Sequence, residues 1–121
     1  MLFTTVKFHF DSAHFLQGYP GKCANLHGHR FEVTATVKFS EVNEIGISID
    51  FSDLKGLLKE IADRFDHSLL NGIPPFDKIN PTAENLSQYF FFELKAKLKT
   101  GKLQKICIWE SPNAWVEYEE G

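Results

Sequence analysis

The chain has 121 residues, of which 43% are hydrophobic and 14% aromatic, and its formal net charge is -3. This length predicts one domain, residues 1–121, with a real core, and twelve phenylalanines suggest that another subunit covers part of the aromatic surface. The acidic balance argues against nucleic acid as a partner, and the lack of a long apolar run or a signal-peptide pattern predicts a cytoplasmic protein without a membrane partner.

Two strands are predicted in the first third of the chain. Apolar residues alternate with polar ones over residues 6–11, and they do so again over residues 30–39. A period of two residues is typical of a half-buried strand, and β-branched residues support the second one. Between the two strands lies a turn-rich loop over residues 17–25.

Two helices are predicted in the middle of the chain. Asp50 can cap the first helix, in which apolar residues recur at helical spacing as far as Phe65. The second helix is expected to begin at Thr82, with leucine and phenylalanine repeating every four residues, and to stop at Gly101.

The tail adds two more strand candidates. Residues 104–109 and 115–118 are separated by Ser111, Pro112 and Asn113, which favour a tight hairpin turn. The element order is therefore ββααββ. It predicts an α+β fold in which a four-stranded antiparallel sheet carries two helices on one face.

Three histidines fall on faces that should be apolar. Residues two apart in a strand point the same way, so His27 and His29 share the face of Phe31, and His14 shares the face of Phe10. If the two strands pair as a hairpin, the three imidazoles converge. Neutral imidazoles that would be costly to bury alone can bind zinc, and three ligands leave a fourth position open.

Cys23 lies four positions before His27, in a loop that must pass close to these histidines. As a fourth ligand it would close the metal site and make it structural. As a thiolate held off the metal it could act as a base or nucleophile. The spacing leaves both interpretations open. The second cysteine, Cys107, has apolar neighbours and is interpreted as a packed core thiol.

Three further polar residues have two interpretations each. Asp66 and His67 follow the first predicted helix, where such a pair can serve as a helix cap or as a proton relay in which the carboxylate orients the imidazole. Glu110 ends the third strand on the side of Ile108, so it is either an exposed terminal charge or a carboxylate that faces the core side.

Six ordered sequence blocks resemble the family of 6-pyruvoyl tetrahydropterin synthases and 6-carboxytetrahydropterin synthases. The resemblance spans essentially the whole chain and is far more specific than one pair of histidines. The blocks are Phe10-Asp11-Ser12-Ala13-His14, Cys23-Ala24-Asn25-Leu26-His27-Gly28-His29, Ile49-Asp50-Phe51-Ser52-Asp53-Leu54-Lys55, Asp66-His67-Ser68-Leu69-Leu70-Asn71, Asn80-Pro81-Thr82-Ala83-Glu84-Asn85-Leu86 and Trp109-Glu110-Ser111.

The resemblance assigns roles to the first two blocks. His14, His27 and His29 match the family's zinc ligands, so it implies Zn²⁺ as the cofactor. Cys23 matches the catalytic cysteine, which removes a substrate proton and does not bind the metal.

It also assigns roles to the later blocks. Asp66 and His67 match the proton-relay pair, and Glu110 matches the carboxylate that anchors the pterin ring and takes part in the relay. Thr82 and Glu84 fall in a block that approaches the pterin.

The family implies a tunnelling fold, in which subunits join their sheets into a barrel. The expected assembly is a homo-oligomer based on a trimer, namely a hexamer, with active sites at subunit interfaces. The implied substrate is the small molecule 7,8-dihydroneopterin triphosphate.

Three residues separate Cys23 from His27, as in bacterial enzymes that make 6-carboxytetrahydropterin, acetaldehyde and triphosphate for queuosine biosynthesis. The alternatives are a 6-pyruvoyl tetrahydropterin synthase and, in a different class, a non-catalytic binding module stabilised by zinc.

Overall fold

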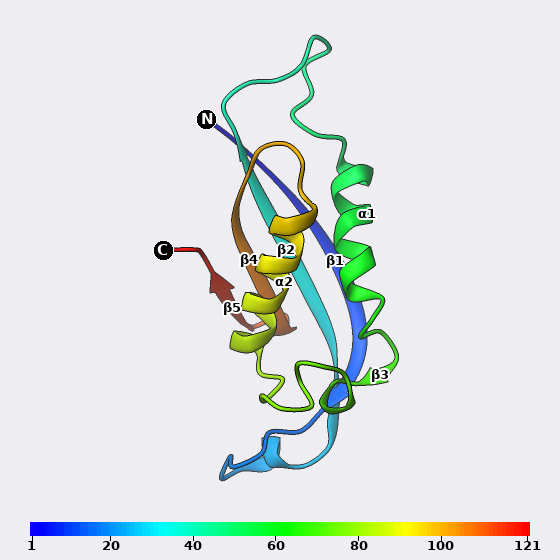
Figure 1. The fold of residues 1–121 in the computed structure, drawn as a ribbon. Helices are drawn as coiled ribbons and strands as arrows, with labels where there is room; N and C mark the ends of the chain where they lie inside the picture. The colour runs from blue at the N-terminus through cyan, green and yellow to red at the C-terminus, as the bar shows by residue number, and fades with distance from the viewer.

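A computed structural model describes all of residues 1–121 and contains one five-stranded sheet (Figure 1). The order of the strands across the sheet is β3-β1-β2-β4-β5. Two helices lie on one side of it, so the expected α+β fold is confirmed. The strands are β1 (Leu2–His14), β2 (His27–Phe39), β3 (Ser68–Leu69), β4 (Lys102–Ser111) and β5 (Ala114–Tyr118).

The long hairpin of β1 and β2 forms the middle of the sheet. Its antiparallel register runs without a bulge from the pair Leu2 and Phe39 to the pair His14 and His27. Because no residue is inserted, the alternation of faces holds along both strands. The histidines at the end of the hairpin therefore stay on the same face as the buried phenylalanines further along.

The predicted sheet of four antiparallel strands is wrong in one respect. The two-residue strand β3 joins the outer edge of β1, where Ser68 and Leu69 pair in parallel with Ser12 and Ala13. A strand of two residues has no periodicity that a sequence pattern could reveal. It anchors the segment after the first helix to the end of β1.

Helix α1 (Phe51–Ala62) begins where predicted, because the Asp50 side chain accepts a hydrogen bond from the backbone N–H of Ser52 at 2.8 Å. It ends three residues before Phe65. There the chain turns, with the Phe65 N–H bonded to the Ala62 carbonyl at 2.9 Å. This turn buries Phe65 fully and brings the next residues to the edge of β1.

Helix α2 (Ala83–Lys97) is capped by the Thr82 hydroxyl, as predicted, but it ends before Gly101 because Leu98 is already extended. Gly101 instead lies in the turn into β4. Its φ of +74° disfavours any other residue, and a Cβ there would come within 2.7 Å of the Phe39 ring.

The core lies between the sheet and the two helices. Helix α1 packs against β1, and α2 packs against β4 and β5 (Figure 1). Phe10 is fully buried and stacks on Phe31 and Phe90, with ring centroids 5.2 and 5.7 Å apart. The opposite face of the sheet carries charged pairs such as Lys7 and Glu32. Neither helix combines the length and the apolarity that crossing a membrane requires.

Candidate metal centre and proton-relay pair

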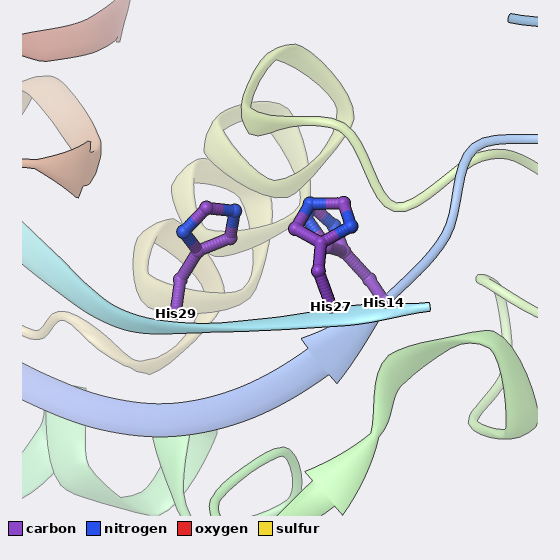
Figure 2. A group of neighbouring side chains, drawn as sticks. All are labelled: His14, His27 and His29. Carbon is purple, nitrogen blue, oxygen red and sulfur yellow. The ribbon is translucent and has the colours of Figure 1, made fainter. Parts of the chain in front are cut away.

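Three histidine side chains meet at the end of the central hairpin, on the face that also carries the core (Figure 2). His14 lies opposite His27, and Ser12 lies opposite His29. The ring centroid of His14 is 4.6 Å from that of His27 and 5.1 Å from that of His29, and the last two are 4.8 Å apart. The predicted convergence of the three imidazoles is confirmed.

Backbone carbonyls orient two of the rings. The Nδ1 of His14 is 2.8 Å from the Pro81 carbonyl, and the Nδ1 of His27 is 2.7 Å from the Asn25 carbonyl. Since a carbonyl can only accept, each Nδ1 carries the hydrogen and each neutral ring keeps its lone pair on Nε2. Orientation of this kind is typical of histidines that bind a metal.

Two of the remaining ring nitrogens have no hydrogen-bond partner. The Nε2 atoms of His14 and His29 are buried and accept or donate no hydrogen bond. Burial lowers the pKa of both imidazoles below the usual 6.5, which favours the neutral form that a metal ion requires. One nitrogen from each of the three histidines lies within 4.8 Å of the others. The cluster therefore has the donors, charge state and spacing to bind a metal ion.

Cys23 lies outside this cluster of ligand atoms. It is half-buried in a short 3-10 turn (Lys22–Ala24) between β1 and β2. Its carbonyl accepts a hydrogen bond from the Leu16 N–H at 2.8 Å, which ties the turn to the chain that follows His14. In this structure the histidine cluster is complete without the thiol.

Glu110 points toward the histidine cluster from β4. Its Oε2 lies 3.9 Å from the Nε2 of His29. The ladder between β4 and β5 shifts register between Trp109 and Ser111, and Glu110 occupies that bulge. Bulges commonly redirect a side chain next to a functional site. A carboxylate is thus held beside the candidate metal centre.

Asp66 and His67 form a separate pair at the outer edge of β1. The Nδ1 of His67 lies 3.0 Å from one carboxylate oxygen of Asp66, and the Asp11 N–H donates to the other at 2.9 Å. His67 has a φ of +56°, and its side chain is 79% exposed. The interpretation of this pair as a helix cap is wrong, because the two residues lie in the turn beyond α1.

The pair and the metal centre are on opposite sides of β1. Asp66, His67 and Asp11 make up one cluster of possible ligands, distinct from the histidine cluster. The Asp11 side chain faces away from the core, whereas the side chain of His14 faces it. Within one chain, the exposed imidazole of His67 does not join the three buried ones.

Thr82 and Glu84, the last two residues that the resemblance places near the pterin, lie at the start of α2. Thr82 accepts a hydrogen bond from the Asn85 N–H at 3.1 Å, so its hydroxyl serves as the helix cap. Glu84 is exposed in the first turn. The neighbouring Pro81 carbonyl, which orients His14, was not foreseen. A main-chain acceptor leaves no signal in the sequence.

We expect low pH to remove the stabilisation that the Asp66 carboxylate gives to the folded state. The Asp11 N–H, and after it the His67 side chain, lower the pKa of Asp66 below its usual value. A lowered carboxyl pKa stabilises the folded state fully above the unfolded value of about 3.9, and this stabilisation is lost as the pH falls through the folded value. We expect urea denaturation of metal-free Asp66→Asn to show a deficit that is constant from neutral pH down to about pH 5 and shrinks below about pH 4.

The exposed Asp77 provides the matched control for this experiment, as Asp77→Asn. A deficit of Asp66→Asn that stays constant down to pH 2 would show that the charge of Asp66 does not stabilise the fold.

Comparison with known proteins gives the chain its family. A family model described as 6-pyruvoyl tetrahydropterin synthase matches residues 4–121. The chain is 30% identical to the 6-carboxy-5,6,7,8-tetrahydropterin synthase of Haemophilus influenzae, over 94% of this chain and 96% of the relative. It is 36% identical to the 6-pyruvoyl tetrahydrobiopterin synthase of Dictyostelium discoideum, over 81% and 73%. The structure of Caenorhabditis elegans 6-pyruvoyl tetrahydropterin synthase superimposes with a TM-score of 0.87 at 27% identity, covering 99% of this chain and 96% of that one. The chain therefore belongs to the 6-pyruvoyl tetrahydropterin synthase family.

Proposed function

We propose that this chain converts 7,8-dihydroneopterin triphosphate and one water molecule to 6-carboxy-5,6,7,8-tetrahydropterin, with release of acetaldehyde and triphosphate, as a step toward queuosine. The observation that carries the proposal is the convergence of three imidazoles, two of which have a buried Nε2 without a hydrogen-bond partner. The relative in Haemophilus influenzae, named for this product, supports the choice of reaction.

The proposed cofactor is Zn²⁺, held by His14, His27 and His29. Three neutral nitrogens suit a zinc ion with one open position, and the three histidines are buried or half-buried. When bound, zinc would act as a Lewis acid that makes protons next to the substrate's side-chain hydroxyls easier to remove. Glu110, 3.9 Å from His29, is near enough to face a substrate at that position.

The protein residues would divide the remaining work. We assign removal of a substrate proton to the Cys23 thiolate. His67 would deliver or accept a second proton, with Asp66 holding its ring through the 3.0 Å contact at Nδ1. The two carboxylate oxygens of Glu110 would accept hydrogen bonds from adjacent N–H groups of the pterin ring, and the segment around Thr82 and Glu84 would lie alongside it.

We further propose that the complete active site forms between subunits of a trimer-based hexamer. His67 is exposed on the far side of β1 from its own histidine cluster, so a second chain must supply a cluster for it to act on. The sheet also has two edges open to pairing: the first part of β1, where Leu2 and Phe3 are exposed, and β5, where Trp115 is exposed. Joining such edges would close the sheets into a barrel and remove them from solvent.

A 6-pyruvoyl tetrahydropterin synthase is the second candidate function. The Dictyostelium and Caenorhabditis relatives bear that name, and the substrate is the same. The three-residue spacing between Cys23 and His27 favours the carboxy product. The two reactions differ in whether the side chain of the substrate is cleaved, which makes acetaldehyde the diagnostic product.

One assay tests the proposal. Zinc-loaded protein is incubated with 7,8-dihydroneopterin triphosphate, and the pterin and any acetaldehyde are identified by mass spectrometry, with chelator-treated protein as the control. We expect 6-carboxytetrahydropterin and acetaldehyde in equal amounts. A pyruvoyl pterin without acetaldehyde would select the second candidate, and an unchanged substrate would favour a non-catalytic binding module.

A further inference from the structure

The backbone between His14 and the Cys23 loop forms hydrogen bonds with side chains and not with a neighbouring strand. Strand β1 ends at His14, and the chain passes through residues 15 and 16 into a turn that begins at Gln17. No strand of the sheet pairs with these residues.

Two asparagine side chains hold the backbone of this segment. The side-chain amide of Asn71 accepts from the Phe15 N–H at 3.0 Å and donates to the Phe15 carbonyl at 3.0 Å. Asn80 does the same to Gln17, at 3.0 and 2.9 Å. Each amide satisfies one donor and one acceptor, as a strand residue would. We call these two contacts the asparagine clamps.

The clamped segment connects directly to the predicted site. Between the two clamped residues, the Leu16 N–H donates to the carbonyl of Cys23 at 2.8 Å. Next to Asn80 in sequence, the Pro81 carbonyl holds Nδ1 of His14 at 2.8 Å. Asn80 is itself fixed, because its carbonyl accepts a bond from the side chain of Asn85 at 2.8 Å.

We propose that Asn71 and Asn80 are positioning residues that hold the Cys23 loop in place beside the metal centre. This inference rests on the proposed function only for the consequence in catalysis, since the clamps themselves are contacts of the folded chain. No strand pairs with residues 15–17, and the two amides hold the backbone N–H and C=O groups of Phe15 and Gln17. Without the clamps, the segment that ties down Cys23 would be free to move.

The test replaces each clamp separately, with Asn71→Ala and Asn80→Ala, in the zinc-loaded protein. We expect backbone hydrogen exchange at residues 15–17 to become at least about tenfold faster. Alkylation of Cys23 by iodoacetamide should also accelerate, with the buried Cys107 as the internal reference within each sample. With 7,8-dihydroneopterin triphosphate as substrate, kcat of Asn71→Ala should fall about tenfold while its KM and zinc content change little, because the Asn71 side chain bonds only the backbone of Phe15.

A matched control is available at the other end of the sheet. The side chain of Asn43 also accepts two backbone hydrogen bonds, from Ile45 and Ile47 at 3.1 and 3.0 Å, in the loop that follows β2 (Figure 1). Asn43→Ala should leave exchange at residues 15–17, the alkylation of Cys23 and kcat as in the wild type. If the Asn80 variant does not fold, Asn71→Ala still removes one complete clamp.

The outcomes separate this inference from the proposed function. Unchanged exchange and alkylation in both clamp variants would overturn the positioning role, and so would faster exchange with an unaltered kcat. A wild-type protein that leaves the substrate unchanged would instead defeat the proposed function, while the exchange and alkylation data would still decide whether the clamps hold the loop.

Discussion

We expect His27→Ala to fold but to lose both its zinc and its activity. The side chain of His27 is half-buried at the beginning of β2, so its removal leaves the main core untouched, whereas His14 is almost fully buried. With one of three ligands gone, zinc affinity should fall by more than about 100-fold. The loss of Lewis-acid assistance should lower kcat by about 10³ or more, several kcal/mol of the barrier.

Metal analysis and thermal unfolding check this expectation together. Wild-type protein should carry about one zinc per chain and gain about 2.7 kcal/mol of stability when free zinc is a hundred times the Kd. The variant should carry almost none and unfold at a temperature that zinc does not change. His9→Ala is the matched control, since His9 is exposed on the other face of β1. If His27→Ala kept a full complement of zinc, the three histidines would not be the site.

The sequence predicted the convergence of the three histidines because of one property of the hairpin. The register between β1 and β2 is unbroken, so counting residues by twos from Phe10 to His14, and from Phe31 back to His27, assigns the faces correctly. A single bulge would have moved one histidine to the opposite face. The same count by twos predicted the face of the sheet on which Glu110 lies. It did not predict the bulge in which Glu110 is held.

The environment of Asp66 and His67 could not be predicted in the same way. Their position depends on a turn after α1, a positive φ at His67 and a two-residue strand. None of these features produces a periodic pattern in the sequence. The Asp66 side chain is held by the backbone N–H of Asp11, more than fifty residues earlier in the chain. The types of the side chains do not indicate which main-chain groups they will bond. For the same reason, the contact between the Pro81 carbonyl and His14 could not be predicted.

We expect Cys23→Ala to retain zinc and lose turnover. The thiol is outside the cluster of ligand atoms, and the three histidines can hold a metal without it. Removing a group that takes a proton from the substrate costs roughly 10² to 10⁴ in rate, so kcat should fall by that factor. Since the metal and Glu110, the proposed ring-binding carboxylate, remain, KM should change far less.

The second cysteine, Cys107, provides the control for this experiment. Cys107 is buried within β4, with Thr34 as its partner on β2, and Cys107→Ala should keep both zinc and kcat if it is assayed below its own unfolding temperature. Zinc content decides between the two interpretations that the sequence left open for Cys23. If Cys23→Ala loses the metal together with activity, the cysteine is a fourth ligand and the site is closed and structural. If the metal stays while turnover disappears, the open position at the zinc is free for substrate, as a catalytic site requires.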